Sequence, residues 1–435
     1  MLRRPTLLIG VALLLVGLVA TVLSLRDSSG GPAPAAPAAV DSVAPPTTEV
    51  PGGRFSPRDR VAKLVARAQA DPRDWRSLAA LASAYIAEAA VTGDPSLYPR
   101  AEEAIRRSQE VQPQGNLPAK IAQSSLAAAR HDFVLALKRG KEAAALAPDN
   151  PTVKAVVGDA QVELGRYDDA FATFQAMIDR RPDLAAYARI SYARELQGDV
   201  DGAVTAMEAA ESAAPSNSDA AFAAYQLGQL EWNRGDAKAA VADYRRALQL
   251  DPAAVRSQAA LARAAYFAGD VKGAVEQYRA VIARFPLTQY VGELADIYTV
   301  TGQRALAKEQ LDLIGAQRRL YEAAGVSVDA ELGLIDADYG IDVKSSLRAV
   351  GAVYRYRRSI IVADALAWLL EADGQSKEAL KYANEALRLG TRNALFYFHR
   401  SRIQRSLGND DAARRDLTEA KAIDPNFSIR YAKRP

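Results

Sequence analysis

The sequence predicts an all-α protein made of about ten helix–turn–helix repeats behind one N-terminal membrane helix. One alanine position recurs every 33 to 38 residues, with serine in a single repeat. A glycine precedes eight successive members by five residues, and a proline follows most members by twelve. The alanine-rich composition agrees with this fold class, because alanine loses no side-chain entropy in a helix.

The N-terminus carries a candidate membrane span. Residues 7–25 form an apolar run without a charged side chain, just long enough to cross a bilayer as a helix. Residues 1–6 contain Arg3 and Arg4, which the positive-inside rule keeps in the cytoplasm, so the rest of the chain would be extracytoplasmic. Secretion after cleavage near Ala33 is the alternative. We expect a retained anchor in the cytoplasmic membrane, because the apolar run exceeds the usual signal core.

A spacer and a first helix should follow the membrane span. Residues 26–56 contain six prolines among alanine, serine, threonine and glycine, a composition that cannot bury a core and predicts a disordered linker. Residues 57–70 are expected to form a capping helix, because Ser56 can cap it and Pro57 suits the first helical position. Its apolar face comprises Val61, Leu64, Val65 and Ala68.

The repeat register runs through residues 71–425. The recurrent position holds Ala101, Ala136, Ala170, Ala203, Ala240, Ala274, Ala307, Ser345, Ala379 and Ala413. The glycines five residues earlier should end the first helix of each pair in a left-handed turn. They are Gly165, Gly198, Gly235, Gly269, Gly302, Gly340, Gly374 and Gly408. The prolines should close the second helix. They are Pro113, Pro148, Pro182, Pro215, Pro252, Pro286 and Pro425.

A second position, twelve residues before the recurrent alanine, is small from the second repeat onward. Its members are Ser124, Gly158, Ser191, Gly228, Ala262, Ala295, Gly333, Ala367 and Ser401. Small residues there would let the paired helices approach closely. Repeat two has His131 in place of the turn glycine, and repeat seven continues into an extension over residues 314–326, so we expect these two joints to bend differently.

These motifs resemble the tetratricopeptide repeat family, whose period is 34 residues. The fifth repeat matches best, through Tyr225, Gln226, Leu227 and Gly228, followed by Gly235, Ala240, Tyr244, Ala247 and Pro252. The resemblance implies a right-handed superhelix with a concave groove, and a protein-interaction scaffold instead of an enzyme. Residues 426–435, which include the basic Arg430, are expected to form a frayed, solvated tail.

The sequence contains no recognisable catalytic, metal-binding or cofactor-binding motif. The chain has no cysteine and two histidines, and it lacks phosphate-binding, nucleophile-elbow and zinc motifs. The fragment from Asp336 to Asp342 resembles a calcium loop, but Leu347 stands at the twelfth position, so an ordinary repeat turn is expected. A net charge of +3 gives no concentrated positive field, which argues against a nucleic-acid partner.

The resemblance also places candidate protein-binding residues on the groove-facing side of the first helices. They are Phe222, Tyr225, Gln229, Trp232, Arg256, Arg263, Tyr266, Asp364, Trp368, Phe398, Arg402 and Arg405. Aromatic residues and arginines anchor interfaces more often than other types, so an extended protein segment with acidic and apolar side chains is the expected ligand. The alternative is that the aromatic residues only fill the interior of the superhelix.

The partner's identity is left open by the sequence. A scaffold for envelope assembly or protein folding is the leading interpretation, and an accessory or regulatory subunit of an envelope enzyme or of cytochrome maturation is the alternative. Assembly of several copies through stacked terminal repeats is a further possibility.

Overall fold

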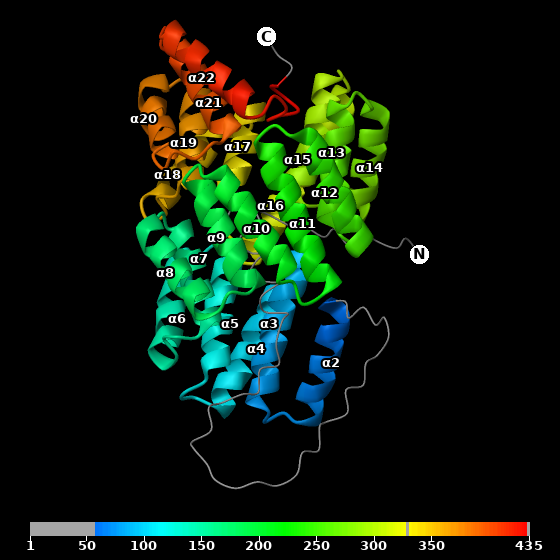
Figure 1. The fold of residues 1–435 in the computed structure, drawn as a ribbon, viewed down its shortest axis with the longest axis vertical. Coiled ribbons are helices and arrows are strands. Elements are labelled where there is room, and N and C mark those ends of the chain that lie inside the picture. Colours follow the sequence, from blue (N-terminus) through cyan, green and yellow to red (C-terminus); the bar gives the residue numbers. More distant parts are fainter. Residues whose placement is uncertain (1–56, 328–329, 433–435) are drawn as a thin grey trace.

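The computed structural model describes residues 57–327 and 330–432, and over these residues the chain contains 21 helices and no strand (Figure 1). Helix α2 (Pro57–Ala70) precedes ten antiparallel helix pairs. The pairs are α3 (Trp75–Thr92) with α4 (Leu97–Val111), α5 (Leu117–Ala129) with α6 (Phe133–Leu146), α7 (Pro151–Glu163) with α8 (Tyr167–Arg180), α9 (Leu184–Leu196) with α10 (Val200–Ser212), α11 (Asn217–Asn233) with α12 (Ala237–Leu250), α13 (Val255–Phe267) with α14 (Val271–Arg284), α15 (Thr288–Val300) with α16 (Arg304–Ala323), α17 (Ala330–Tyr339) with α18 (Val343–Tyr354), α19 (Ile360–Ala372) with α20 (Ser376–Ala386), and α21 (Ala394–Ser406) with α22 (Asp410–Ile423).

The small residues of the repeat lie where paired helices cross. Ala170 and Ala240 have no exposed surface. A Cβ atom added to Gly158 would lie 2.3 Å from the ring of Phe174, and one added to Gly228 would lie 2.4 Å from the ring of Tyr244. Because no side chain fits in such a space, the glycines permit the aromatic ring of the second helix to pack directly on the first.

Repeat eight departs from the predicted register by one residue. Ser345, expected at the buried position, is half-buried, whereas Ser346 is buried and its hydroxyl contacts the carboxylate of Asp336. The reason lies in the turn before α18, where Asp342 adopts a left-handed conformation with φ of 43°. The turn therefore takes up one more residue than in the other repeats, and the prediction for Ser345 was wrong.

The predicted turn conformations are present. All eight turn glycines have φ between 66° and 96°. His131, which replaces the glycine of repeat two, has φ of 60°, a conformation that costs a residue with a side chain about 1–2 kcal/mol. The helices also stop just before the prolines, as at α8, which ends two residues before Pro182.

The array coils back on itself, so that turns in its first half meet loops in its second half. The backbone N–H of Ser327 donates to the carbonyl oxygen of Arg130 at 3.2 Å. The backbone N–H of Arg358 donates to Leu164 at 3.3 Å, and the hydroxyl of Thr391 donates to the carbonyl of Leu196. Each contact joins the turn of one repeat to the loop that follows the repeat five places later, and Figure 1 shows the result, with α18 lying beside α7 and α8.

The extension in repeat seven lengthens α16, so that the end of this helix reaches the first repeat and α2. Tyr321 and Val326 are buried in one apolar cluster with Leu64 of α2 and with Tyr98 of α4. Gln317, also fully buried, accepts a hydrogen bond from Thr288 and donates one to the carbonyl of Pro286. The extension therefore closes the contact between the first and the seventh repeat.

The candidate membrane span at residues 7–25 and the linker at 26–56 lie outside the residues that the structure describes. Of the helices from α2 to α22, none combines the length and apolar character needed to cross a bilayer.

Candidate functional site

The first helices of repeats four to six carry a row of half-buried polar and aromatic side chains, which we call the open inner face. It consists of Tyr192 and Glu195 on α9, Tyr225 and Gln229 on α11, and Arg263 on α13. The guanidinium of Arg263 donates to the side-chain oxygen of Gln229 at 3.1 Å. The rings of Tyr225 and Tyr244 lie 6.0 Å apart, and the hydroxyl of Tyr244 donates to Gln229 at 2.6 Å. Tyr225, Gln229 and Arg263 are therefore held in position by contacts within the chain.

The side chain of Arg263 also contacts Trp232 and Glu293. Its guanidinium lies 4.7 Å from the ring centre of Trp232, and one of its nitrogens lies 4.0 Å from a carboxylate oxygen of Glu293. Trp232 itself is only 3% exposed. For Trp232 the structure thus favours the interior-packing alternative, because Arg263 and Phe267 cover its ring.

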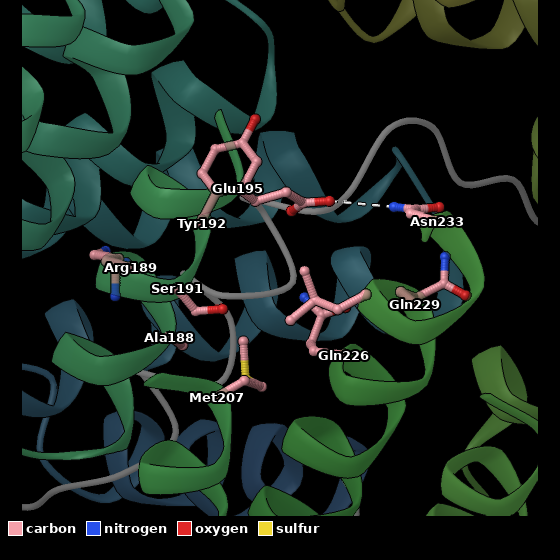
Figure 2. A pocket seen from close by; sticks show the side chains of 10 residues that line it. Ala188, Arg189, Ser191, Tyr192, Glu195, Met207, Gln226, Gln229 and Asn233 are labelled. Atoms are coloured by element: carbon pink, nitrogen blue, oxygen red, sulfur yellow. Dashed lines mark hydrogen bonds between the residues drawn. The ribbon is translucent and has the colours of Figure 1, made fainter. Parts of the chain in front are cut away.

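A small pocket of about 40 Å³ lies in the open inner face between α9 and α11 (Figure 2). Tyr192, Glu195, Gln229 and Asn233 are among its lining residues. The amide of Asn233 donates to the carboxylate of Glu195 at 3.2 Å, and burial raises the pKa of that carboxyl above its usual value. The pocket has room for a few water molecules, so it can add hydrogen bonds to a bound segment but cannot enclose a substrate.

Sequence reasoning did not select Glu195 and Asn233. Glu195 lies three residues after Tyr192 on α9, and Asn233 lies four residues after the groove position Gln229 on α11, so the two side chains of each pair lie on the same side of their helix. Spacing by three or four residues from the groove positions was the signal that could have identified them.

The predicted groove residues of repeats nine and ten divide into two groups. Asp364 is 1% exposed, and its carboxylate lies 3.0 Å from Nδ1 of His399, whose ring stacks on Trp368 at 4.3 Å. These residues connect α19 to α21. Arg402 and Arg405 are exposed on the surface of α21. The twelve predicted residues therefore do not form one continuous surface.

The C-terminal segment lies against the inner helices, and the expectation of a frayed, solvated tail was wrong for residues 426–432. Helix α22 ends before Pro425, and Ser428 then caps a single turn by accepting hydrogen bonds from the backbone N–H groups of Arg430 (3.2 Å) and Tyr431 (3.3 Å). Figure 1 shows this red segment turning from α22 towards α15 and α17. Ile429 is only 5% exposed.

The segment covers a second part of the inner surface, which we call the covered inner face. It consists of Asp296 on α15, Asp338 and Tyr339 on α17, Trp368 on α19 and Phe398 on α21. The guanidinium of Arg430 contacts Asp296 on α15 and Asp338 on α17. The ring of Tyr431 contacts the rings of Trp368 and Phe398. Tyr266, another predicted groove residue, shares an apolar cluster with Ile429.

Burial changes the ionisation of two carboxyls near this segment. It raises the pKa of Asp296 to about 7, partly opposed by a hydrogen bond from Tyr339 and by the charge of Arg430. It also raises the pKa of Asp424, at the end of α22, to about 6, partly opposed by a backbone hydrogen bond from Asn426 and by the charge of Arg263. Both carboxyls are therefore poised to titrate between mildly acidic and neutral pH.

The fragment that resembles a calcium loop does not converge on a cation. Asp336 pairs with Arg318 at 2.7 Å, whereas Asp338 accepts a hydrogen bond from the indole of Trp368 at 2.7 Å. Throughout residues 57–327 and 330–432, no group of three side chains has the arrangement of a metal site.

Comparison with known proteins supports the repeat architecture. The family model for the tetratricopeptide repeat matches more than half of the chain, at residues 117–185, 156–218, 187–255, 225–288 and 365–426. Cellulose synthase operon protein C of Pseudomonas fluorescens (strain SBW25) is 32% identical over 139 residues, which are 31% of this chain and 11% of that protein. The chain therefore spans about a tenth of the length of this relative.

Two solved structures are similar to this chain at low identity. The human IFIT1 dimer with PPP-AAAA is 15% identical and has a TM-score of 0.46, over 76% of this chain and 77% of that one. A thermophilic tetratricopeptide repeat protein of Thermus thermophilus, TTC0263, is 17% identical and has a TM-score of 0.36, over 47% and 99%. On the match to the family model, together with the repeat register, this chain belongs to the tetratricopeptide repeat family.

Proposed function

We propose that the chain is a non-catalytic scaffold that binds an extended segment of a partner protein on the open inner face. The observation that carries this proposal is the row of half-buried polar and aromatic side chains on α9, α11 and α13, which is rigidly positioned and borders a small polar pocket. The C-terminal segment covers another part of the inner surface.

The side chains on this face favour a segment with both apolar and acidic residues. Tyr225 on this face and Phe222, three residues before it on α11, provide half-buried aromatic surface. Arg256 on α13, at the edge of this face, adds a positive charge near Tyr225. Arginine and aromatic side chains can anchor a ligand at a modest cost in entropy. A carboxylate of the ligand would lie near Arg256 and an apolar side chain near Phe222.

We also propose that residues 7–25 anchor the chain in the cytoplasmic membrane, with the repeats on the extracytoplasmic side. The uncharged apolar run and the two preceding arginines support this topology. A wash in high salt should leave the full-length chain in the membrane fraction, because an inserted helix is not held by screened charges. Release by salt alone would contradict the anchor.

The binding proposal is tested by placing a photoreactive amino acid at position 222 of the full-length chain, with the same group at Lys238 on the exposed side of α12 as the control. We expect a protein partner to be crosslinked from position 222 and not from position 238. The double variant Tyr225→Ala with Arg263→Ala should weaken its binding by about 2 kcal/mol or more, whereas Arg402→Ala with Arg405→Ala should not.

The stability of the double variant needs its own measurement, because Arg263 contacts Gln229, Trp232 and Glu293. Titration of the isolated partner at a temperature where all variants are folded separates the loss of binding from the loss of structure. Equal affinity of the wild-type chain and the double variant would place the binding face elsewhere.

A further inference from the structure

The covered inner face contains a position built for an arginine. The guanidinium of Arg430 lies 4.1 Å from the ring centre of Tyr339. One of its nitrogens donates to the carbonyl oxygen of Asp338 at 2.6 Å, and the other lies 3.5 Å from a carboxylate oxygen of Asp296. A flat cation that stacks on a ring, donates to a carbonyl oxygen from one nitrogen and faces a carboxylate with another is a geometry that arginine provides and lysine does not.

An aromatic position lies next to it. The rings of Tyr431 and Phe398 stack with centres 4.8 Å apart, and the ring centres of Tyr431 and Trp368 lie 6.1 Å apart in an edge-to-face arrangement. The hydroxyl of Tyr431 donates to the Asp338 carboxylate at 2.7 Å, and the same oxygen accepts from the indole of Trp368 at 2.7 Å. Asp338 therefore recognises both the residue at the arginine position and the residue at the aromatic position.

An aliphatic position precedes these two. Ile429 is buried in the apolar cluster formed by Tyr266 and Leu294 of α13 and α15. Three successive residues of the segment thus have separate and chemically different receiving positions, spread over the first helices of repeats six to ten. This is the arrangement expected of a ligand on a receptor, since each side chain contacts a different combination of helices.

The segment is also attached in a way that permits its release. It is a single capped turn beyond the last helix pair, so its departure breaks no repeat. One guanidinium nitrogen of Arg430, Nη1, is buried without a hydrogen bond. This nitrogen faces the carboxylate of Asp296, and a buried donor without a hydrogen bond weakens the contact that Arg430 makes. A competing segment whose arginine is better aligned would form that hydrogen bond and bind more tightly.

We propose that the covered inner face is a second binding site, specific for a protein segment in which an aliphatic residue, an arginine and an aromatic residue follow one another. The chain's own Asn426–Ala432 segment occupies this site as an internal competitor, and a partner segment of the same chemistry binds by displacing it. This inference rests on the proposed function of the array as a protein-binding scaffold.

The test uses the full-length chain and a fluorescent synthetic heptapeptide with the sequence of residues 426–432. In the variant Arg430→Glu, the new negative charge faces Asp296 and Asp338 and should expel the internal segment. The matched control is Arg414→Glu, the same charge change at an exposed position of α22. We expect the peptide to bind Arg430→Glu at least tenfold more tightly than it binds the wild-type chain or Arg414→Glu. A peptide with lysine in place of the arginine should bind at least fivefold more weakly.

Several outcomes would overturn the proposal. Equal peptide affinity for the three chains, or no binding to Arg430→Glu while its helices remain folded, would show that the face is not a receptor. Loss of amide protection throughout α19 to α22 in Arg430→Glu, measured by hydrogen exchange, would show that the segment is a structural part of the last repeats. A wild-type dimer in light scattering that Arg430→Glu dissociates would assign the site to the tail of a second copy.

This result is separable from the test of the open inner face. Peptide binding to Arg430→Glu without any partner crosslinked from position 222 would leave the receptor site in place and contradict only the proposed function. A partner crosslinked from position 222, with no peptide binding to Arg430→Glu, would do the reverse.

Discussion

The turn glycines of repeats three to five and those of repeats six, seven, nine and ten have the same place in the repeat but different surroundings. Gly165 and Gly302 have φ of 73° and 79°, so their backbones are equivalent. A Cβ atom on Gly165 would lie 2.2 Å from the carbonyl oxygen of Arg358, whereas one on Gly302 would meet no atom within 4 Å. Gly198 and Gly235 resemble Gly165, since the second half of the chain lies against them too.

A glycine at the same turn position of the repeat can therefore be required for two different physical reasons. At the open turns, glycine is needed only because a left-handed conformation is strained for other residues. At the three contacted turns, it is also needed because a backbone carbonyl from the second half of the chain occupies the space of a side chain. The contacted turns hold the two halves together, and the open turns serve only their own repeat.

The largest effect is expected from Gly165→Ala. The added methyl group combines strain in the left-handed turn with a clash against the carbonyl of Arg358, which is part of the backbone and cannot rotate away. The free energy of unfolding should fall by roughly 3 to 5 kcal/mol. Denaturant unfolding measures this loss, and hydrogen exchange should show that the amide of Arg358, bonded to Leu164, loses protection. A change no larger than that of Gly302→Ala would disprove the proposed contact.

The next effect concerns the ion pair beside the same turn. Arg357 pairs with Glu163, and their side chains are only 8% and 13% exposed. Arg357 also lies 4.5 Å from the ring centre of Phe133. Arg357→Met should lower the free energy of unfolding by about 3 kcal/mol, because it leaves the Glu163 carboxylate largely buried without its cation.

The control for this variant is Arg106→Met, which breaks an exposed pair with Glu103 on α4. Exposed pairs contribute little to stability, so its unfolding curve should coincide with that of the wild-type chain. Coincident curves for Arg357→Met and Arg106→Met would show that the ion pair does not hold the two halves together.

A smaller effect should appear on changing the pH at the third contacted turn. Asp424 lies against Gly235, and burial raises its pKa from 3.8 to about 6. Between these values the folded chain keeps a proton that the unfolded chain has lost, so the free energy of unfolding should fall as the pH rises from about 4 to about 6. The contribution is on the order of 2 kcal/mol.

The variant Asp424→Asn isolates this contribution, because the amide does not titrate. Its free energy of unfolding, measured in denaturant at several pH values, should decline less between pH 4 and pH 6 than that of the wild-type chain. Parallel pH profiles for the two chains would show that Asp424 is not the group responsible.

The smallest effect is expected from Gly302→Ala. With no atom within 4 Å of the added methyl group, only the strain of the left-handed turn remains, and it should cost about 1 kcal/mol. The loss of amide protection should stay within repeats six to eight and the helices α2 to α5 near the end of α16, because each repeat otherwise contacts chiefly its neighbours. A loss that reached α9 and α10 of repeat four would mean that the open turns also connect the two halves.

Parts of the candidate site were accessible from the sequence and parts were not. The groove register placed Gln229 and Arg263 on adjacent first helices, and the hydrogen bond between their side chains shows that they lie close together. It could not show that Trp368 and Phe398 are covered by residues 426–432, because that contact joins segments without a common repeat pattern. A basic, irregular terminus has no periodicity from which its docking could be predicted.

The sequence by itself determined the helix pairs, their turns and the close crossings within each pair. These features depend on local properties that recur with the repeat: the left-handed conformation at Gly165 or Gly302, the missing side chain at Gly228, and the helix stop before Pro182. Only the tertiary structure decided how far the array coils, since small rotations at each joint add up over five repeats before one turn meets another. The contact of Gly165 with Arg358 and the docking of Arg430 on Asp296 arise from that accumulated rotation, which no single repeat specifies.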